Sequence, residues 1–278
     1  MLDTPSIVPN AQPLQRAQGT AKVAVKHRDG KSVLDTLYQQ GCAKIRIPKS
    51  QGNWLEAVLI NSSGGLTGGD RLAWAAEAQA DTHLVVTTQA CERVYRSIGG
   101  HARVTTELEI GSGARLDWLP QETILFEAAA LDRKLDVSMA ADATFLGLEA
   151  VILGREAMGE DAIASALTDR WRVRREGQLL HAEMTRLEAG CLISRTNHAL
   201  LDNARAFGTL CFIGEDADRK AEQIKALLAA CPNGGVSTIG DKLIVRALAA
   251  SGYDLRKVLM PVIALLAAGQ AVPRLWTL

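Results

Sequence analysis

Val104-Thr-Thr-Glu-Leu-Glu-Ile-Gly-Ser-Gly-Ala-Arg-Leu-Asp-Trp118 is the stretch of sequence that decides the fold. Between Val104 and Ile110, every second side chain would fall on one face of an extended strand, and the glutamates would fall on the other face. Gly111-Ser-Gly113 then offers a turn, after which apolar residues resume the same period up to Trp118. We therefore predict two strands here, joined as a β-hairpin.

The same period of two recurs along most of the chain. Asp29-Gly30 and Glu176-Gly177 are typical of short hairpin turns, and we predict that residues 22–26 pair with residues 42–47 and that residues 171–173 pair with residues 180–184. Alternating or apolar segments predict further strands at residues 22–26, 42–47, 57–60, 135–139, 146–152, 171–173 and 180–184. The fold class is therefore mainly β. Alternation does not separate a sandwich from a β-solenoid, because the strands of both have one inward face.

The period changes after Arg219, where apolar residues follow the spacing of one helical face. These residues are Ala221, Ile224, Leu227, Leu228 and Cys231. Pro232-Asn-Gly-Gly235 provides a stop, and a strand is predicted over residues 243–248. A second helix is predicted over residues 253–268, with Pro261 either kinking it or delaying its start. We thus expect a β body with two α-helices near the C-terminus.

The first residues differ from the rest of the chain. Residues 1–20 contain three prolines and no apolar period, so we predict a flexible N-terminal segment, with the first ordered element beginning near Ala21. No repeat of fixed period and no Gly/Ser linker divides the remainder. Residues 21–278 are therefore expected to form a single β-rich domain.

Composition and charge exclude several classes of protein. Of the 278 residues, 47% are hydrophobic, which is enough for a sizeable core and excludes a disordered chain. The 31 basic residues balance the 31 acidic ones, so no positive field gathers nucleic acid or an anionic membrane. The longest uncharged stretch, residues 258–273, is too short for a transmembrane helix of about 20 residues. Because the N-terminus also lacks an export signal, we predict a cytoplasmic protein.

Cysteines and histidines do not indicate a disulfide framework or a zinc cage. The five cysteines lie far apart and are expected to stay reduced, with Cys191, Cys211 and Cys231 as small buried side chains. No C-x-x-C pair and no H-x-x-x-H spacing occurs. The G-x-S-x-G, H-E-x-x-H and kinase signatures are also missing from the sequence, so no motif supports an enzyme.

The most unusual segment is Asn61-Ser-Ser-Gly-Gly-Leu-Thr-Gly-Gly-Asp-Arg71, which places four glycines in six residues. A phosphate-binding loop would need a following Lys-Ser/Thr, a G-x-G-x-x-G pattern or a helix-forming run, and the segment has none of these. The alternative is a tight corner or β-bulge between strands, in which Asp70 caps backbone N–H groups.

Three further segments gather polar side chains between or after predicted strands, at residues 87–97, 118–126 and 154–161. The last of them holds three carboxylates and an arginine between glycines. Such oxygen ligands suit a divalent cation held transiently, and solvated loop charges explain them equally well.

Taken in order, seven short motifs resemble those of the urease accessory protein D family, UreD, which is also called UreH. They are Lys22-Val-Ala-Val, S-G-G-x-x-G-G-D-R-L at residues 63–72, T-T-Q-A at 87–90, V-Y-R-S at 94–97, P-Q-E at 120–122, G-R-x-A-x-G-E at 154–160 and P-R-L-W at 273–276. Together they span about nine tenths of the chain. Cys91-Glu92-Arg93 and Thr67 depart from the residues that are frequent in the family.

This resemblance implies a β-helical body carrying a helical pair, and a chaperone-scaffold that is not an enzyme. Family members act with the accessory protein UreF and the GTPase UreG, and dock on apo-urease so that nickel reaches its active site. We therefore expect UreF, UreG and the urease apoprotein as partners. The GTPase activity would belong to UreG, in agreement with the missing P-loop in this chain.

Nickel would pass along weak sites rather than bind as a tight cofactor, because each site must release the ion again. The motifs single out Asp70, Glu122 and Glu160 as candidate metal ligands, with an ion pair or a backbone cap as the alternative role of each. The thiol of Cys91 leaves open a further metal or redox role. We predict no catalytic and no cofactor-binding residues.

Several alternatives stay open at this point. A carbohydrate-active enzyme on a β-solenoid would use the arginines and carboxylates of the same segments. A nickel store would need clustered soft or imidazole ligands, which the sequence does not show. The two C-terminal helices would either face UreF or cover the β body with their apolar faces.

Overall fold

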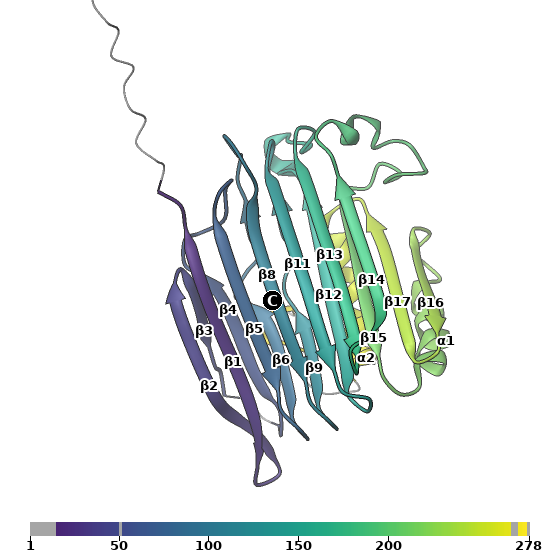
Figure 1. Ribbon diagram of the computed structural model, residues 1–278. Coiled ribbons are helices and arrows are strands. Elements are labelled where there is room, and N and C mark those ends of the chain that lie inside the picture. The colour runs from purple at the N-terminus through teal and green to yellow at the C-terminus, as the bar shows by residue number, and fades with distance from the viewer. Residues whose placement is uncertain (1–14, 50–51, 268–271, 277–278) are drawn as a thin grey trace, which may run out of the picture.

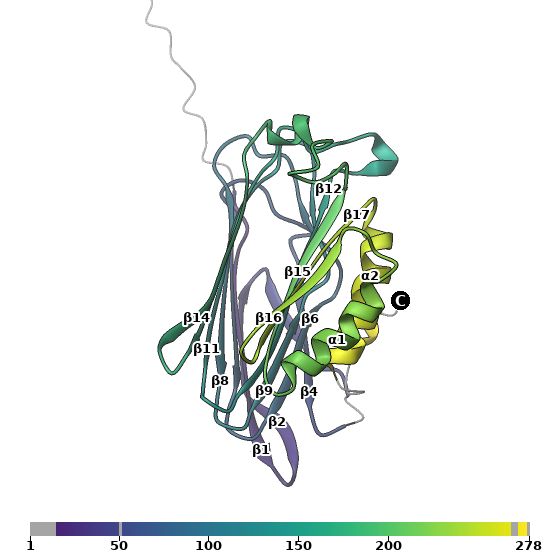
Figure 2. The same ribbon diagram turned by 90° about the vertical axis from the view of Figure 1, so that its right-hand side faces the viewer.

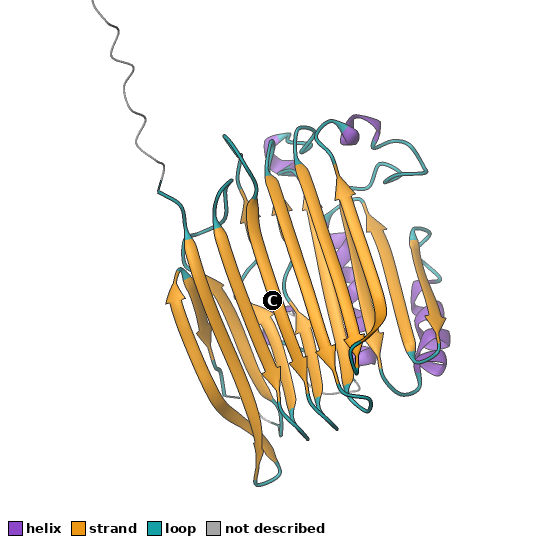
Figure 3. Cartoon of the chain, in the orientation of Figure 1, coloured by secondary structure: helices purple, strands orange, loops and turns teal. Residues whose placement is uncertain are grey.

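The computed structural model describes residues 15–49, 52–267 and 272–276 of the chain. The strands in these ranges form two sheets, of seven and ten strands, which lie face to face (Figures 1 and 2). Strands make up most of the molecule, and the two α-helices lie together on one side of it (Figure 3). Most of the N-terminal segment predicted to be flexible lies outside the described residues.

Sheet A, the seven-stranded sheet, faces the viewer in Figure 1. In spatial order it contains β14 (Gln178–Leu187), β13 (Ala166–Arg175), β11 (Ala130–Met139), β8 (Ala102–Ile110), β5 (Arg71–Ala78), β1 (Gln18–Arg28) and β2 (Lys31–Gly41). The first strand thus begins slightly before the predicted start at Ala21.

Sheet B, the ten-stranded sheet, lies behind sheet A in that view. Its main path contains β16 (Gly234–Ile239), β17 (Lys242–Ala249), β15 (Ala206–Ile213), β12 (Thr144–Leu153), β9 (Arg115–Leu119), β6 (His83–Thr88), β4 (Leu55–Asn61) and β3 (Ala43–Arg46). The short strand β10 (Thr123–Leu125) pairs with β12, and β7 (Glu92–Val94) pairs with β10. Three short 3₁₀ helices are η1 (Glu156–Met158), η2 (Cys191–Ser194) and η3 (Arg274–Trp276).

The chain winds between the two sheets as a solenoid. Apart from β7 and β10, it alternates from β4 to β13 between sheet B and sheet A, and the stacked strands of each sheet run parallel. Arg71 of β5 pairs with Arg103 of β8, which pairs in turn with Asp132 of β11. The first step spans 32 residues and the second 29, so no fixed period is visible in the sequence. The predicted mainly β, solenoid-like fold is confirmed.

The turn at Asp29-Gly30 and the hairpin at Glu176-Gly177 are confirmed, but the pairing predicted between residues 22–26 and 42–47 is wrong, because β1 pairs with β2 and β3 pairs with β4. β1 and β2 pair antiparallel around Asp29-Gly30, and β13 and β14 pair antiparallel around Glu176-Gly177. The φ angles of Asp29 and Gly30 are 51° and 75°, and those of Glu176 and Gly177 are 48° and 77°. Positive φ at both positions matches the hairpin turns that follow the natural twist of paired strands.

The third predicted hairpin, at Gly111-Ser-Gly113, is wrong. β8 lies in sheet A and β9 in sheet B, so the turn carries the chain from one sheet to the other. Gly111 donates its N–H to the carbonyl of Ala78 at 2.8 Å, and Arg115 donates to that of Thr82 at 2.7 Å. Both acceptors belong to the preceding turn of the solenoid. Alternation reports which face of a strand is buried, and it does not identify the strand's partner.

Two apolar layers hold the elements together. The larger layer lies between sheets A and B and includes inward side chains of both. The second lies between sheet B and the helices α1 (Ala217–Leu228) and α2 (Gly252–Leu266), which Figure 2 shows against that sheet. The residues that the helices bury are Ala217, Ala221, Ile224, Leu228, Leu255, Leu259, Val262, Ile263 and Leu266. Their apolar faces therefore cover the β body, which is one of the two alternatives predicted for them.

Both predicted helices and the strand between residues 243 and 248 are confirmed. Leu227, predicted on the buried face of α1, is 45% exposed. Pro261 lies inside α2 on its exposed side, and the helix continues past it. Strand β16 was not predicted, because the glycines at its start indicated only the end of a helix. In the three described ranges, no helix combines the length and the apolar character required to cross a membrane.

Candidate functional site

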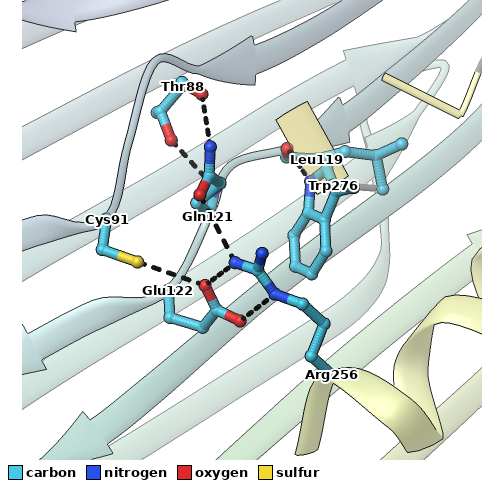
Figure 4. Close-up of polar contacts among 7 residues, drawn as sticks. All are labelled: Thr88, Cys91, Leu119, Gln121, Glu122, Arg256 and Trp276. Carbon is cyan, nitrogen blue, oxygen red and sulfur yellow. Dashed lines mark hydrogen bonds and ion pairs between the residues drawn. The ribbon is translucent and has the colours of Figure 1, made fainter. Parts of the chain in front are cut away.

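A polar cluster lies where the turn after β9 meets α2 (Figure 4). Glu122 of the P-Q-E motif is only 1% exposed. Arg256 of α2 donates from Nε to Glu122 Oε1 at 3.0 Å and from Nη2 to Oε2 at 2.6 Å. A two-point contact of this kind fixes the orientation of both side chains as well as their charges. The sequence identified Glu122, and it gave no indication of Arg256.

Two other motifs contribute residues around the same arginine. Gln121 donates its backbone N–H to Thr88 Oγ1 at 2.9 Å and its side-chain amide to the carbonyl of Thr88 at 3.1 Å. Trp276 donates from Nε1 to the carbonyl of Leu119 at 2.8 Å, and the Arg256 guanidinium lies 5.0 Å from the centre of its ring (Figure 4). The T-T-Q-A, P-Q-E and P-R-L-W motifs, far apart in the sequence, therefore meet in one place.

The thiol of Cys91 belongs to this cluster as a hydrogen-bond donor. Its Sγ donates to Glu122 Oε2 at 3.3 Å (Figure 4). Burial, together with the Glu122 carboxylate, raises the pKa of the Cys91 thiol to about 12. The thiolate is the form that binds metals and attacks disulfides, and a thiol with this pKa stays protonated at neutral pH. The structure therefore gives the metal or redox role considered for Cys91 no support.

The glycine-rich loop is a tight corner in which Asp70 acts as a backbone cap, as the alternative interpretation predicted. Asp70 Oδ1 accepts the N–H of Ala17 at 2.8 Å, and Oδ2 accepts that of Thr67 at 2.8 Å. Thr67 Oγ1 in turn donates to the carbonyl of Arg96 at 2.8 Å. The loop thus holds the V-Y-R-S segment in place beside it.

A half-buried carboxylate, Glu92, lies beside the same loop. Asn61 donates from Nδ2 to Glu92 Oε1 at 3.2 Å and to the carbonyl of Gly65 at 3.3 Å. Burial raises the pKa of Glu92 to about 7, although the hydrogen bond from Asn61 opposes this rise. Glu92 differs from the residue that is frequent in the family at this position, and the sequence predicts no role for it.

Glu160 forms an ion pair within its own motif. Arg155 Nε donates to Glu160 Oε2 at 2.8 Å, and Arg155 Nη2 contacts Oε1. The hydrogen bond from Arg155 lowers the pKa of Glu160. The Arg155 guanidinium lies 4.4 Å from the ring centre of Phe126, which packs edge-on against Tyr95 at 5.0 Å. The G-R-x-A-x-G-E motif is therefore attached to the V-Y-R-S segment.

The three candidate metal ligands have separate partners. Asp70 caps the backbone, Glu122 pairs with Arg256, and Glu160 pairs with Arg155. Within the described ranges, no group of three or more His, Cys, Asp or Glu side chains is arranged to hold a metal ion. Their assignment as metal ligands thus stays a prediction, and each also has a structural role.

A second cluster of charges lies between the two sheets and was not predicted. Arg133 of β11 donates from Nη2 to Asp169 Oδ2 of β13 at 2.6 Å and contacts Glu149 Oε2 of β12 through Nη1. Trp118 Nε1 donates to Glu149 Oε1 at 3.0 Å. Glu149 is the single charged residue in the apolar run of residues 145–153, and that interruption was the available signal in the sequence.

Burial dominates the electrostatics of this second cluster. It raises the pKa of Glu149 to about 7, even though Arg133 opposes the rise. Burial also disfavours the charge on Arg133, but Asp169 and Glu149 outweigh it and raise the pKa of Arg133. Asp169 Oδ1 and Arg133 Nε are buried without a hydrogen-bond partner among the described residues. Unpaired buried polar atoms are rare in folded proteins and indicate bound water, an ion or a function.

Comparison with known proteins gives one consistent family. The family model described as UreD urease accessory protein matches residues 17–277. The chain is similar to the urease accessory protein UreD of Chelativorans sp. (strain BNC1), with 53% identity over 266 residues and 96% of each chain covered. It is 49% identical to that of Rhizobium etli over 273 residues, which cover 98% of this chain and 100% of the relative. Identity to that of Agrobacterium fabrum is 48% over 264 residues, covering 95% and 92%.

Proposed function

Because the chain belongs to the UreD family of urease accessory proteins, we propose that it is a scaffold for urease maturation and not an enzyme. In this proposal the protein works in the cytoplasm with UreF and UreG, docks on apo-urease, and helps nickel to reach the active site. Nickel is the cargo and not a resident cofactor. The family description and the names of the relatives favour this role over a carbohydrate-active enzyme.

The buried charges between the sheets are the observation that supports a role in moving nickel. Two carboxylates, Glu149 and Asp169, share the one guanidinium of Arg133, so the cluster contains one carboxyl group more than it has cations. Proteins seldom bury such groups for stability, because well-packed apolar residues of the same volume are often as stable. Carboxylate oxygens also bind Ni²⁺ less tightly than imidazole or thiolate does, so an ion held here can be released.

Polar side chains continue from this cluster to the edge of the sandwich. Glu149 is paired in register with Thr209 of β15, whose hydroxyl donates to Glu183 Oε1 at 3.2 Å. Glu183 also contacts Arg246 at 2.6 Å, and the Arg246 side chain is 59% exposed. Burial lowers the pKa of His181, whose Nε2 lies 3.6 Å from Glu183, so the imidazole is neutral and able to bind a cation. We place the route of the ion along these groups.

Asp70, Glu122 and Glu160 stay candidates for other parts of the route. Because each already has a structural partner, changing any of them to Ala alters both folding and the proposed metal contact. The interior groups give a sharper test, since Glu149→Gln and Asp169→Asn remove charge while keeping the shape of the side chain. Glu107→Gln is a matched control on the exposed face of sheet A.

The test measures the nickel content and activity of urease in cells that express each variant with the urease and accessory genes. We expect normal amounts of the two interior variants and normal copurification with UreF, with a several-fold loss of nickel in urease. The Glu107→Gln control should behave as wild type. Normal nickel content in both interior variants would contradict the route. Unchanged urea breakdown in cells that lack the protein would contradict the scaffold role itself.

A further inference from the structure

Strand β16 is an open edge of sheet B, with β17 on one side and no other strand of the described chain beside it. The N–H of Leu248 in β17 bonds to the carbonyl of Asn233 at 2.9 Å. Residues whose backbone groups bond to the partner strand alternate along an antiparallel pair. The backbone N–H and C=O groups of Gly235, Ser237 and Ile239 therefore also point toward β17. The backbone N–H and C=O groups of Val236 and Thr238 therefore point outward, away from the sheet.

The other sheet edges have protective features that β16 lacks. The edge strands β2 and β14 each contain a register shift in their pairing and carry charged side chains, such as Asp35 and Glu183. The edge strand β3 carries Lys44 and Arg46. In contrast, β16 has the sequence Gly-Gly-Val-Ser-Thr-Ile, with regular pairing, no charge and no proline. An edge of this kind is a ready template for another strand.

Helix α1 lies next to this edge strand, as the right-hand side of Figure 1 shows. A cavity of about 380 Å³ lies between them, lined by residues 236–238 of β16 and by charged side chains of α1. The charged residues are Asp218, Arg219, Glu222 and Lys225, and all four are exposed. Their signs alternate along the helix. If two such helices lie antiparallel, Asp218 faces Lys225 and Arg219 faces Glu222, so opposite charges meet at every position.

We propose that β16 pairs with β16 of a second copy of this chain about a two-fold axis. The two copies of sheet B then form one continuous sheet. Val236 of each copy exchanges backbone hydrogen bonds with Thr238 of the other, and the two α1 helices lie antiparallel beside the joint. A two-fold axis requires a self-complementary surface, and the charge order of α1 meets that requirement. Since the strand has six residues and the helix twelve, the interface is small and the dimer is concentration-dependent.

Sedimentation of the full-length protein over a concentration series tests the strand contact. Thr238→Pro removes an outward N–H that the monomer does not use and places a ring on the free edge. We expect this variant to remain monomeric at concentrations where the wild type is dimeric, with an unchanged circular dichroism spectrum. A wild type that is monomeric at every soluble concentration, or a dimer that survives Thr238→Pro, would overturn the proposal.

A charge-exchange series tests the helix contact and does not depend on the proline variant folding. In the dimer, Arg219→Glu places a glutamate opposite Glu222 of the other copy at two symmetry-related positions. We expect this repulsion to raise the dissociation constant of the dimer about tenfold. Adding Glu222→Arg to that variant should restore wild-type affinity. Gln223→Glu, an exposed change outside the groove, is the control and should have no effect. Failure of the double exchange to restore the dimer, or cross-links that show a different protein on β16 and no dimer, would also overturn the proposal.

Discussion

Arg256 of α2 holds Glu122, 134 residues earlier in the chain, through hydrogen bonds of 3.0 and 2.6 Å. The ion pair connects a helix on the outside of sheet B to the turn that follows β9. Trp276 adds a third attachment, since its ring lies against the same guanidinium and its indole N–H bonds to Leu119. One arginine therefore adds polar attachments to the apolar layer that packs α2 on sheet B.

Removal of that arginine should be costly. Arg256→Leu leaves the Glu122 carboxylate buried without a cation, and we expect the free energy of unfolding to fall by about 3 kcal/mol. That figure is at the low end of the usual range, because the Arg256 side chain is 23% exposed. Urea unfolding measures the loss, and Lys257→Ala on the exposed side of α2 serves as the control. Adding Glu122→Gln should recover part of the loss, and an unchanged midpoint for Arg256→Leu would refute the assignment.

Cys91 should resist alkylation in the folded protein. With a pKa of about 12 instead of the ordinary 9, its thiolate at pH 8 is about a thousandfold scarcer than in the unfolded chain. Mass spectrometry after iodoacetamide treatment, with and without urea, measures the labelling rate of this cysteine. Equal rates in the two conditions would show that the thiol is not held as the structure indicates.

The carboxyl of Glu92 should make stability depend on pH. Because burial raises its pKa from 4.5 to about 7, the folded chain keeps a proton that the unfolded chain has lost between these pH values. The free energy of unfolding therefore falls as the pH rises from about 4.5 to 7, and it levels off above that range.

Glu92→Gln tests this pH dependence. The variant should exceed wild type by about 2 kcal/mol at pH 8, a value reduced from the full shift because the side chain is partly exposed. At pH 4.5 the two proteins should be equally stable. Denaturant unfolding across this range gives the comparison, and Glu149 contributes its own pH dependence equally to both proteins. Parallel pH curves for the two proteins would contradict the raised pKa.

The glycines of the S-G-G-x-x-G-G-D-R-L motif should differ in their tolerance of a side chain. A Cβ at Gly68 would lie 2.0 Å from Ser97 Oγ and 2.4 Å from the carbonyl oxygen of Gly99, so the V-Y-R-S segment would have to move. We expect Gly68→Ala to lower the free energy of unfolding by about 3 kcal/mol. Gly64, at φ 81°, has open space around it, and Gly64→Ala should cost about 1 kcal/mol of backbone strain. Thermal unfolding distinguishes the two, and equal losses would contradict the packing described.

Features that depend on neighbouring residues were predictable from the sequence. The turn at Asp29-Gly30, the apolar face of α1 and the capping role of Asp70 all follow from local chemistry. The crossing at Gly111-Ser-Gly113 was not predictable, because a turn between two sheets contains the same residues as a turn within one. Strand β16 was missed because its first two residues are glycines.

The candidate site was predictable only in part, for a related reason. The motifs identified Glu122, but its partner Arg256 is set by tertiary structure and has no signal in the local sequence. Three different strands each contribute one inward charged side chain, namely Arg133, Glu149 and Asp169. Only the stacking of successive turns of the solenoid brings these side chains together. The odd placement of Glu149 in an apolar run was visible, but it did not indicate which cation it meets.

The alternation of strands between the two sheets also limits how this architecture can change in length. Loss of a single strand would move every later strand into the opposite layer, where it would stack against different neighbours. Only the gain or loss of a complete turn, with one strand for each layer, keeps each remaining strand in its own layer. Insertions that lengthen the body should therefore come as complete turns, which add between 29 and 36 residues each, the rise in sequence number from one stacked strand to the next between β5 and β13 of sheet A.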